Sequence, residues 1–248
     1  MVIKFICEYN GKGFHGFQRQ GSLRTVQSVL EEALSKYFGE RIKIVASGRT
    51  DTGVHAMGQV CSFWIASSGA SHPPRNDMYK VCAAINAFLP LDVSVRDFEV
   101  MPDDFHAQFS AKSKTYIYKC YVSKFRSALR DGTHLQLYSM PDIEKMKAAA
   151  KGFVGTRSFK EYTTDKVDSR DFVRTIYCFD VIHNQTPRQP NGCHPSILEG
   201  NYFLDDEIHL IINGSGFMRN MVRILCGAVL GMGKTLPAHG LVLESVQY

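Results

Sequence analysis

The segment "ASGRTDTGVHA" (residues 46–56) holds a single carboxylate, Asp51, between an arginine and a histidine. Strand-like runs on both sides, "IKIVA" and "GQVCSFWI", predict that it is a loop between two strands. A lone carboxylate that cationic neighbours keep ionised can act as a nucleophile or a base. Glycosidases need two carboxylates, and the sequence offers no obvious second one. The alternative is a solvated turn, because Asp, Gly and Thr are common turn residues.

Three arginines are candidates to hold Asp51 ionised and oriented. Arg49 stands two residues before it in the same loop. Arg219 and Arg223 are four residues apart and are predicted to share one face of a helix over residues 217–231. That helix contains no acidic residue, so its arginines need a partner elsewhere, which is Asp51, phosphate or solvent. Solvent suits Arg223 poorly, because it lies within the apolar run "MVRILCGAVLG".

Hydrophobic periodicity predicts the elements that must position these residues. Strands are expected at 2–8, 42–46, 58–65, 93–99, 114–122, 172–183, 208–213 and 240–247, and helices at 25–38, 77–89, 142–154 and 217–231. The order is β-α-β-β-α-β twice, which is the ferredoxin-like pattern. We therefore expect an α/β (α+β) protein in which two ferredoxin-like halves share a mixed, largely antiparallel sheet across a central basic cleft.

The "VMPDDFHAQFSA" segment marks the expected boundary between the halves. The N-terminal half covers residues 1–104 and carries the Asp51 loop. The C-terminal half covers residues 105–248 and includes a long loop near 184–201, which is rich in Pro, Asn and His.

Composition and local patterns exclude several classes of protein. No apolar run is long enough to span a bilayer, and the N-terminus does not read as a signal peptide. The seven cysteines form no CxxC pair, which predicts a reducing, intracellular and cytoplasmic setting with no metal site. The "GKGFHG" segment matches GxGxxG, but the next helix does not open at its glycines. We expect a β-turn there and no nucleotide cofactor.

Residues 112–130, "KSKTYIYKCYVSKFRSALR", contain four lysines, two arginines and three tyrosines but no acidic residue. Cations interleaved with aromatic rings suit a polyanion with flat bases. We expect phosphate contacts from Lys112, Lys114 and Lys124. A solvated strand face is the alternative for any one of these charges.

Several segments in the same order resemble the tRNA pseudouridine synthase A (TruA) family. They are "EYNGKGFHGFQRQ", "TVQSVLEEAL", "GRTDTGVHAMGQV", "INAFLP", "DDFHAQFSAKSKTYIYK", "RTI", "FMRNMVRILCG" and "GLVLESVQY". The resemblance runs from residue 2 to the end of the chain. It implies an enzyme that isomerises uridine to pseudouridine in tRNA, in the anticodon stem-loop, without cofactor or metal.

The resemblance also implies a role for each site residue. Asp51 matches the catalytic aspartate, and Arg223 matches the basic residue that forms a salt bridge with it. Tyr116, the first tyrosine of "YIY", matches the residue that stacks on the target uracil. Arg49 matches an arginine that helps to hold the target base out of the helix.

The sequence leaves two alternative functions, and it departs from the family pattern at one place. A non-catalytic RNA-binding or RNA-folding module would bind tRNA without converting it, and a nucleoside glycosidase would release free uracil. Family members carry an extra helical segment where this chain has only Lys234, Thr235 and Leu236. The resemblance implies a homodimer, and the missing segment bears on whether that contact forms.

Overall fold

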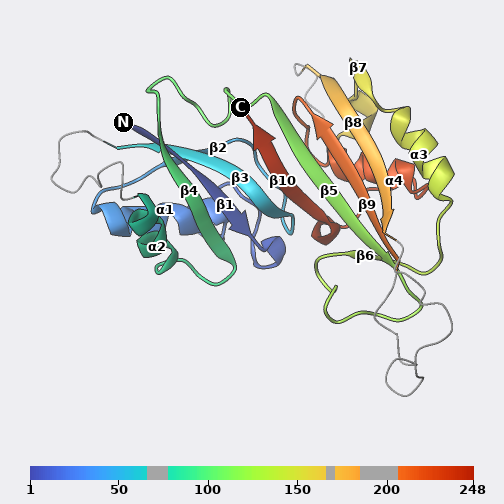
Figure 1. Ribbon diagram of the computed structural model, residues 1–248, viewed down its shortest axis with the longest axis horizontal. Helices are drawn as coiled ribbons and strands as arrows, with labels where there is room; N and C mark the ends of the chain where they lie inside the picture. Colours follow the sequence, from blue (N-terminus) through green and yellow to red (C-terminus); the bar gives the residue numbers. More distant parts are fainter. Residues whose placement is uncertain (66–77, 166–170, 185–205) are drawn as a thin grey trace, which may run out of the picture.

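The computed structural model describes residues 1–65, 78–165, 171–184 and 206–248 (Figure 1). The described strands are β1 (Val2–Tyr9), β2 (Ile44–Ala46), β3 (His55–Trp64), β4 (Val93–Met101), β5 (Ser113–Val122), β6 (Leu135–Leu137), β7 (Gly155–Ser158), β8 (Val173–Asn184), β9 (Asp206–Gly214) and β10 (Leu241–Gln247). The helices are α1 (Val26–Phe38), α2 (Met78–Asn86), α3 (Ile143–Lys151) and α4 (Met221–Val229). Residues 185–201 of the expected long loop lie outside the described residues.

All ten described strands belong to one sheet in which most neighbours are antiparallel, as the sequence predicts. The main path is β4-β1-β3-β10-β5-β9-β8-β7, with β2 beside β3 and β6 beside β5. Each half keeps the predicted β-α-β-β-α-β order, to which the second half adds the short strands β6 and β7. Figure 1 shows α1 and α2 beside the N-terminal strands, and α3 and α4 beside the C-terminal ones.

Alternating apolar residues build the core on one face of this sheet. In β1 the residues Ile3, Phe5 and Cys7 are fully buried, and in β9 the residues Ile208 and Leu210 are as well. This period of two puts every second side chain on the helix-covered face. The expected amphipathic helix over 25–38 is confirmed, because α1 buries its apolar stripe and is capped by Thr25 and Gly39.

The helix that carries Arg223 begins later than the sequence pattern predicts. Its first residue is Met221, and Asn220 before it has a left-handed φ of 59°. The prediction that Arg219 and Arg223 share one helical face is therefore wrong, because Arg219 precedes α4. The backbone carbonyl of Arg219 instead accepts a hydrogen bond from the Thr163 hydroxyl (3.0 Å). Asn tolerates positive φ better than most residues, which allows the chain to turn there.

The two halves join where β10 runs parallel to β3. Two residue pairs define this junction, Val242 with His55 and Leu243 with Ala56. β10 also pairs antiparallel with β5, so one strand borders elements from both halves. Among the described helices, none is long and apolar enough to cross a membrane.

Gly58 of β3 tests this junction, because a Cβ there would lie 2.2 Å from the backbone oxygen of Glu244 in β10. We expect Gly58→Ala to force β3 and β10 apart and to lower the free energy of unfolding by about 1–3 kcal/mol. Urea denaturation measures this change. Gly216→Ala is the matched control, since a Cβ there meets no atom within 4 Å. Equal stability of the two variants would show that the junction tolerates separation.

Candidate active site

The Asp51 loop is a tight turn between β2 and β3. The backbone N–H of Val54 donates to the carbonyl of Asp51 (3.1 Å), which closes a four-residue turn. Gly53 stands at its third position with a φ of 80°, the position at which a type II turn requires glycine. Asp51 is half-buried, while Arg49 and Thr52 on either side are exposed. The turn thus presents a carboxylate at the surface of the sheet.

The residue before Asp51 ties the turn to the first strand. The buried hydroxyl of Thr50 shares a hydrogen bond with the Tyr9 hydroxyl (2.8 Å). The Thr50 carbonyl accepts from the backbone N–H of Phe17 (3.1 Å). Two contacts on Thr50 therefore fix the backbone from which Asp51 projects.

The "GKGFHG" segment supports the same loop. Gly11–Gly13 forms a short 3₁₀ helix where the sequence suggests a β-turn. The backbone N–H of Gly11 donates to Nδ1 of His55 (3.1 Å), the first residue of β3. This bond requires an unprotonated Nδ1, and burial lowers the pKa of His55. The segment thus supports the Asp51 loop through its hydrogen bond to His55.

A second set of contacts holds the start of the loop. The Ser47 hydroxyl donates to Oε1 of Gln59 (2.6 Å), and Nε2 of Gln59 donates to the Gly48 carbonyl (2.9 Å). Lys114 of β5 donates from Nζ to the Ser47 carbonyl (2.6 Å). Burial lowers the pKa of this lysine. Lys114, expected to contact phosphate, instead supports the loop from the C-terminal half.

Tyr116 lies two residues further along β5 and is buried. It is opposite Leu243 of β10 and Ile212 of β9, and its ring meets that of Phe217 edge-on at a centroid distance of 5.4 Å. Burial raises the pKa of Tyr116, and the negative charge of Asp51 raises it further. The fold thus brings Asp51 and Tyr116, which are distant in sequence, into one electrostatic environment.

Arg223 is engaged by its own half of the chain. Its Nε donates to the Leu236 carbonyl (2.6 Å), and Nη1 donates to Oδ1 of Asn220 (2.8 Å). The ion pairs among the described residues do not include Arg223 with Asp51. The guanidinium therefore holds residues 234–236, the short link between α4 and β10, against α4.

The link that Arg223 holds leads directly to the Asp51 loop. After Leu236, the Pro237 carbonyl accepts from the Tyr118 hydroxyl (2.9 Å). The next residue, Ala238, has its Cβ 3.3 Å from where a Cβ of Gly53 would lie. Pro237 and Ala238 thus connect the link that Arg223 holds to the Asp51 turn.

Comparisons with known proteins agree with this arrangement of segments. A family model described as tRNA pseudouridine synthase matches residues 6–110 and 149–236. The chain belongs to this family. It is 33% identical to the tRNA pseudouridine synthase A of Syntrophotalea carbinolica over 100% of this chain and 96% of that protein. The tRNA pseudouridine synthases A of Bacillus licheniformis and Bacillus subtilis are each 35% identical over 100% of this chain and 99% of theirs.

The family resemblance inferred from the motifs is thus confirmed, but the quoted segments did not show which of their residues hold the Asp51 loop. Tyr9, Ser47, Gln59 and Lys114 come from three strands and a loop. Ser47, Thr50 and Gln59 belong to the stretch around Asp51, whereas Tyr9 and Lys114 belong to other quoted segments. No spacing rule predicts these partners, because hydrogen bonds between distant segments exist only once the strands pair.

The Tyr9–Thr50 hydrogen bond predicts a measurable cost. Tyr9→Phe leaves the buried Thr50 hydroxyl without this partner and should lower the free energy of unfolding by about 1–3 kcal/mol. Urea denaturation gives the value. The double variant Tyr9→Phe, Thr50→Val removes both groups, so we expect less destabilisation than the sum of the single changes. Additive effects would show that the two hydroxyls do not depend on each other.

Proposed function

We propose that this member of the tRNA pseudouridine synthase family isomerises uridine to pseudouridine in the anticodon stem-loop of tRNA, with Asp51 as the catalytic carboxylate. The observation that carries the proposal is the turn that presents Asp51 at the surface of the sheet, where its negative charge raises the pKa of Tyr116. The reaction breaks the bond between uracil N1 and the ribose, turns the base and forms a bond from C5. The C5 proton leaves and N1 gains one, so neither water nor an oxidant is consumed.

Asp51 supplies the anionic group that this chemistry needs. A carboxylate acts as a nucleophile on base or sugar, or as a base toward a sugar proton. The turn leaves Asp51 half-buried, which keeps it accessible to a nucleotide while its backbone is fixed. Preorganisation of this kind lowers the cost of reaching the reactive geometry.

Tyr116 provides an aromatic ring for the extruded uracil. A base inside a stem must leave the stack before its glycosidic bond is reachable, and this costs a few kcal/mol. Stacking on an aromatic ring offsets part of that cost. The ring of Tyr116 is buried in the free protein, so the proposal includes a shift of Phe217, its edge-on neighbour, when RNA binds.

The two arginines take different roles in the proposal. Arg49 is exposed beside Asp51 and holds the target nucleotide out of the stem through its phosphate or by filling the vacated space. Arg223 pairs with Asp51 in the RNA-bound state. The guanidinium of Arg223 has N–H donors beyond the two that bind Leu236 and Asn220. The chain that follows Leu236 reaches Ala238, which lies against Gly53 of the Asp51 turn.

Asp51→Asn is the direct test, because it keeps size and polarity while removing the charge. We expect no detectable pseudouridine in tRNA transcribed in vitro, with tRNA affinity unchanged. Pseudouridine mapping and a binding titration measure the two effects. The control is Asp97→Asn, an exposed carboxylate at a φ of 56°, where Asn fits equally well. Binding without conversion by the unmodified protein would favour the non-catalytic RNA-binding module.

Substitutions at Tyr116 separate stacking from chemistry. Tyr116→Ala should lose about 1–3 kcal/mol of stacking on the extruded base, seen as a fall in kcat/KM. Tyr116→Phe keeps the ring and should retain most of the tRNA affinity. Tyr138→Ala is the control, since this tyrosine is exposed in the same half. Unchanged turnover in both Tyr116 variants would remove this ring from the site.

A further inference from the structure

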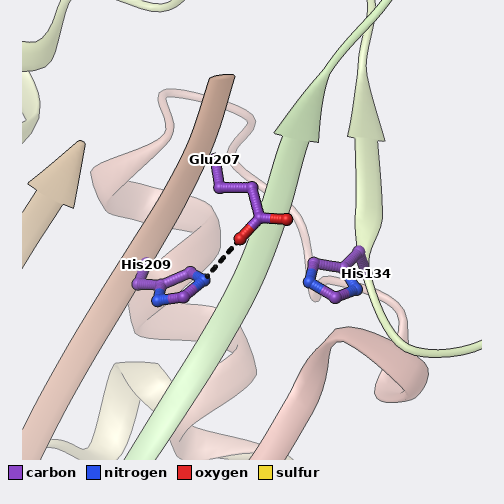
Figure 2. A group of neighbouring side chains, drawn as sticks. All are labelled: His134, Glu207 and His209. Atoms are coloured by element: carbon purple, nitrogen blue, oxygen red, sulfur yellow. Dashed lines mark ion pairs between the residues drawn. The ribbon is translucent and has the colours of Figure 1, made fainter. Parts of the chain in front are cut away.

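His134, Glu207 and His209 form a cluster of residues with metal-ligand side chains (Figure 2). Glu207 and His209 are two residues apart on β9 and so lie on one face of the sheet. His134 comes from the segment just before β6. One nitrogen or oxygen from each residue lies within 4.8 Å of the other two. It is the one such group of three in the part of the chain that the structure describes.

The separation between Glu207 and His209 fits two ligands of one ion better than a charged hydrogen bond. Nε2 of His209 lies 3.4 Å from Oε2 of Glu207, and this buried nitrogen has no hydrogen-bond partner among the described residues. Charged N–H···O bonds are shorter, about 2.7–2.9 Å. Two ligands at Zn–N and Zn–O distances of about 2.0–2.1 Å in tetrahedral geometry stand about 3.3 Å apart.

The neighbour of His134 is placed to favour a lone pair on Nε2, the nitrogen that faces away from Thr133. Thr133 donates from its hydroxyl to the Arg130 carbonyl (3.2 Å), and Nδ1 of His134 lies 2.9 Å from the same hydroxyl. When the Thr133 hydroxyl donates its one proton to the Arg130 carbonyl, its oxygen accepts a hydrogen bond from Nδ1–H of His134. The lone pair then sits on Nε2, as in histidines that bind metals and are oriented by a second partner.

Arg130 orients the carboxylate in a similar way. Its Nε and Nη2 both donate to Oε1 of Glu207 (3.2 and 2.9 Å), so Oε2 is the oxygen directed at His209. Arg130 and Lys119, which stands opposite His209 on β5, add positive charge near the cluster. Both weaken the attraction for a cation, while the donor set of two imidazoles and a carboxylate favours zinc.

We propose that His134, Glu207 and His209 bind a Zn²⁺ ion, with a water or another ligand in the fourth position. The ion would tie the segment before β6 to β9. That segment follows the exposed Lys124 and Arg126 of the basic tract, so the ion would hold the end of this tract against the sheet. The sequence spacing predicts no metal, because His134 and His209 come from segments that only the fold brings together.

The test is a titration of the full chain, first stripped with a chelator, with Zn²⁺ against a chromophoric competitor. We expect saturable binding of one ion that His134→Ala and His209→Asn each weaken at least about tenfold. Zn²⁺ should also raise the Tm of the protein in which the three ligands are intact but not of these variants. All proteins carry Cys193→Ser and His194→Gln, which removes an adjacent thiol and imidazole that could bind zinc by themselves.

The matched control is His183→Ala, whose Nε2 is also buried and lies 3.5 Å from a carboxylate oxygen of Asp206. Asp206 and His183 lie on the opposite face from Glu207 and His209, since residue 206 alternates with 207 and His183 pairs with Ile208. We expect this variant to bind Zn²⁺ normally. Absence of saturable binding, or binding that His134→Ala and His209→Asn leave unchanged in proteins with a normal circular dichroism spectrum, would overturn the proposal.

Discussion

The parallel pairing of β10 with β3 is the contact on which the site depends. β3 begins immediately after the Asp51 turn, and β10 borders β5, which carries Tyr116. Without this pairing the carboxylate and the aromatic ring would belong to separate sheets. The contact is short and close, with a glycine of β3 against the backbone of β10. If β3 and β10 separated slightly, Asp51 would move with β3 and Tyr116 would move with β5 and β10, so the distance between them would grow.

Buried polar contacts then fix the turn relative to both halves. Thr50 is held by Tyr9 from the first strand, and Ser47 is held by Lys114 from the second half. A buried polar group that loses its partner costs more than an average hydrogen bond contributes, so these contacts strongly favour one backbone arrangement. Asp51 can remain partly exposed because its neighbours, rather than its own side chain, anchor the turn. The residues that hold the turn are therefore different from Asp51, the residue proposed to do the chemistry.

Two hydrogen bonds stabilise the short link between α4 and β10. Arg223 binds the Leu236 carbonyl, and the Tyr118 hydroxyl binds the carbonyl of Pro237. These two hydrogen bonds provide partners for the backbone carbonyl groups of Leu236 and Pro237, which the short connection turns toward the protein interior. The same bonds place Arg223 beside the elements that touch the Asp51 turn. Arg223, which resembles a catalytic partner by its motif, thus has a structural role in the free protein, and this role uses the fixed fork geometry of the guanidinium.

The sequence by itself determined the order of the elements, the mixed sheet and the family, and it singled out Asp51 and Tyr116. Apolar alternation in β1 and β9 and the capped stripe of α1 are local signals, since each is set by residues a few positions apart. The motif around Asp51 is equally local. The start of α4 was misplaced, because the apolar pattern continues past Asn220 while its backbone turns into the left-handed region.

Only the tertiary structure decided which distant side chains meet. It placed Lys114, expected to contact phosphate, against the Asp51 loop and Arg223 against the link, and it assembled His134 with Glu207 and His209. The physical reason is that sequence patterns report burial and periodicity along one segment. Hydrogen bonds and ligand sets depend on strand order and register, which arise when the whole sheet forms.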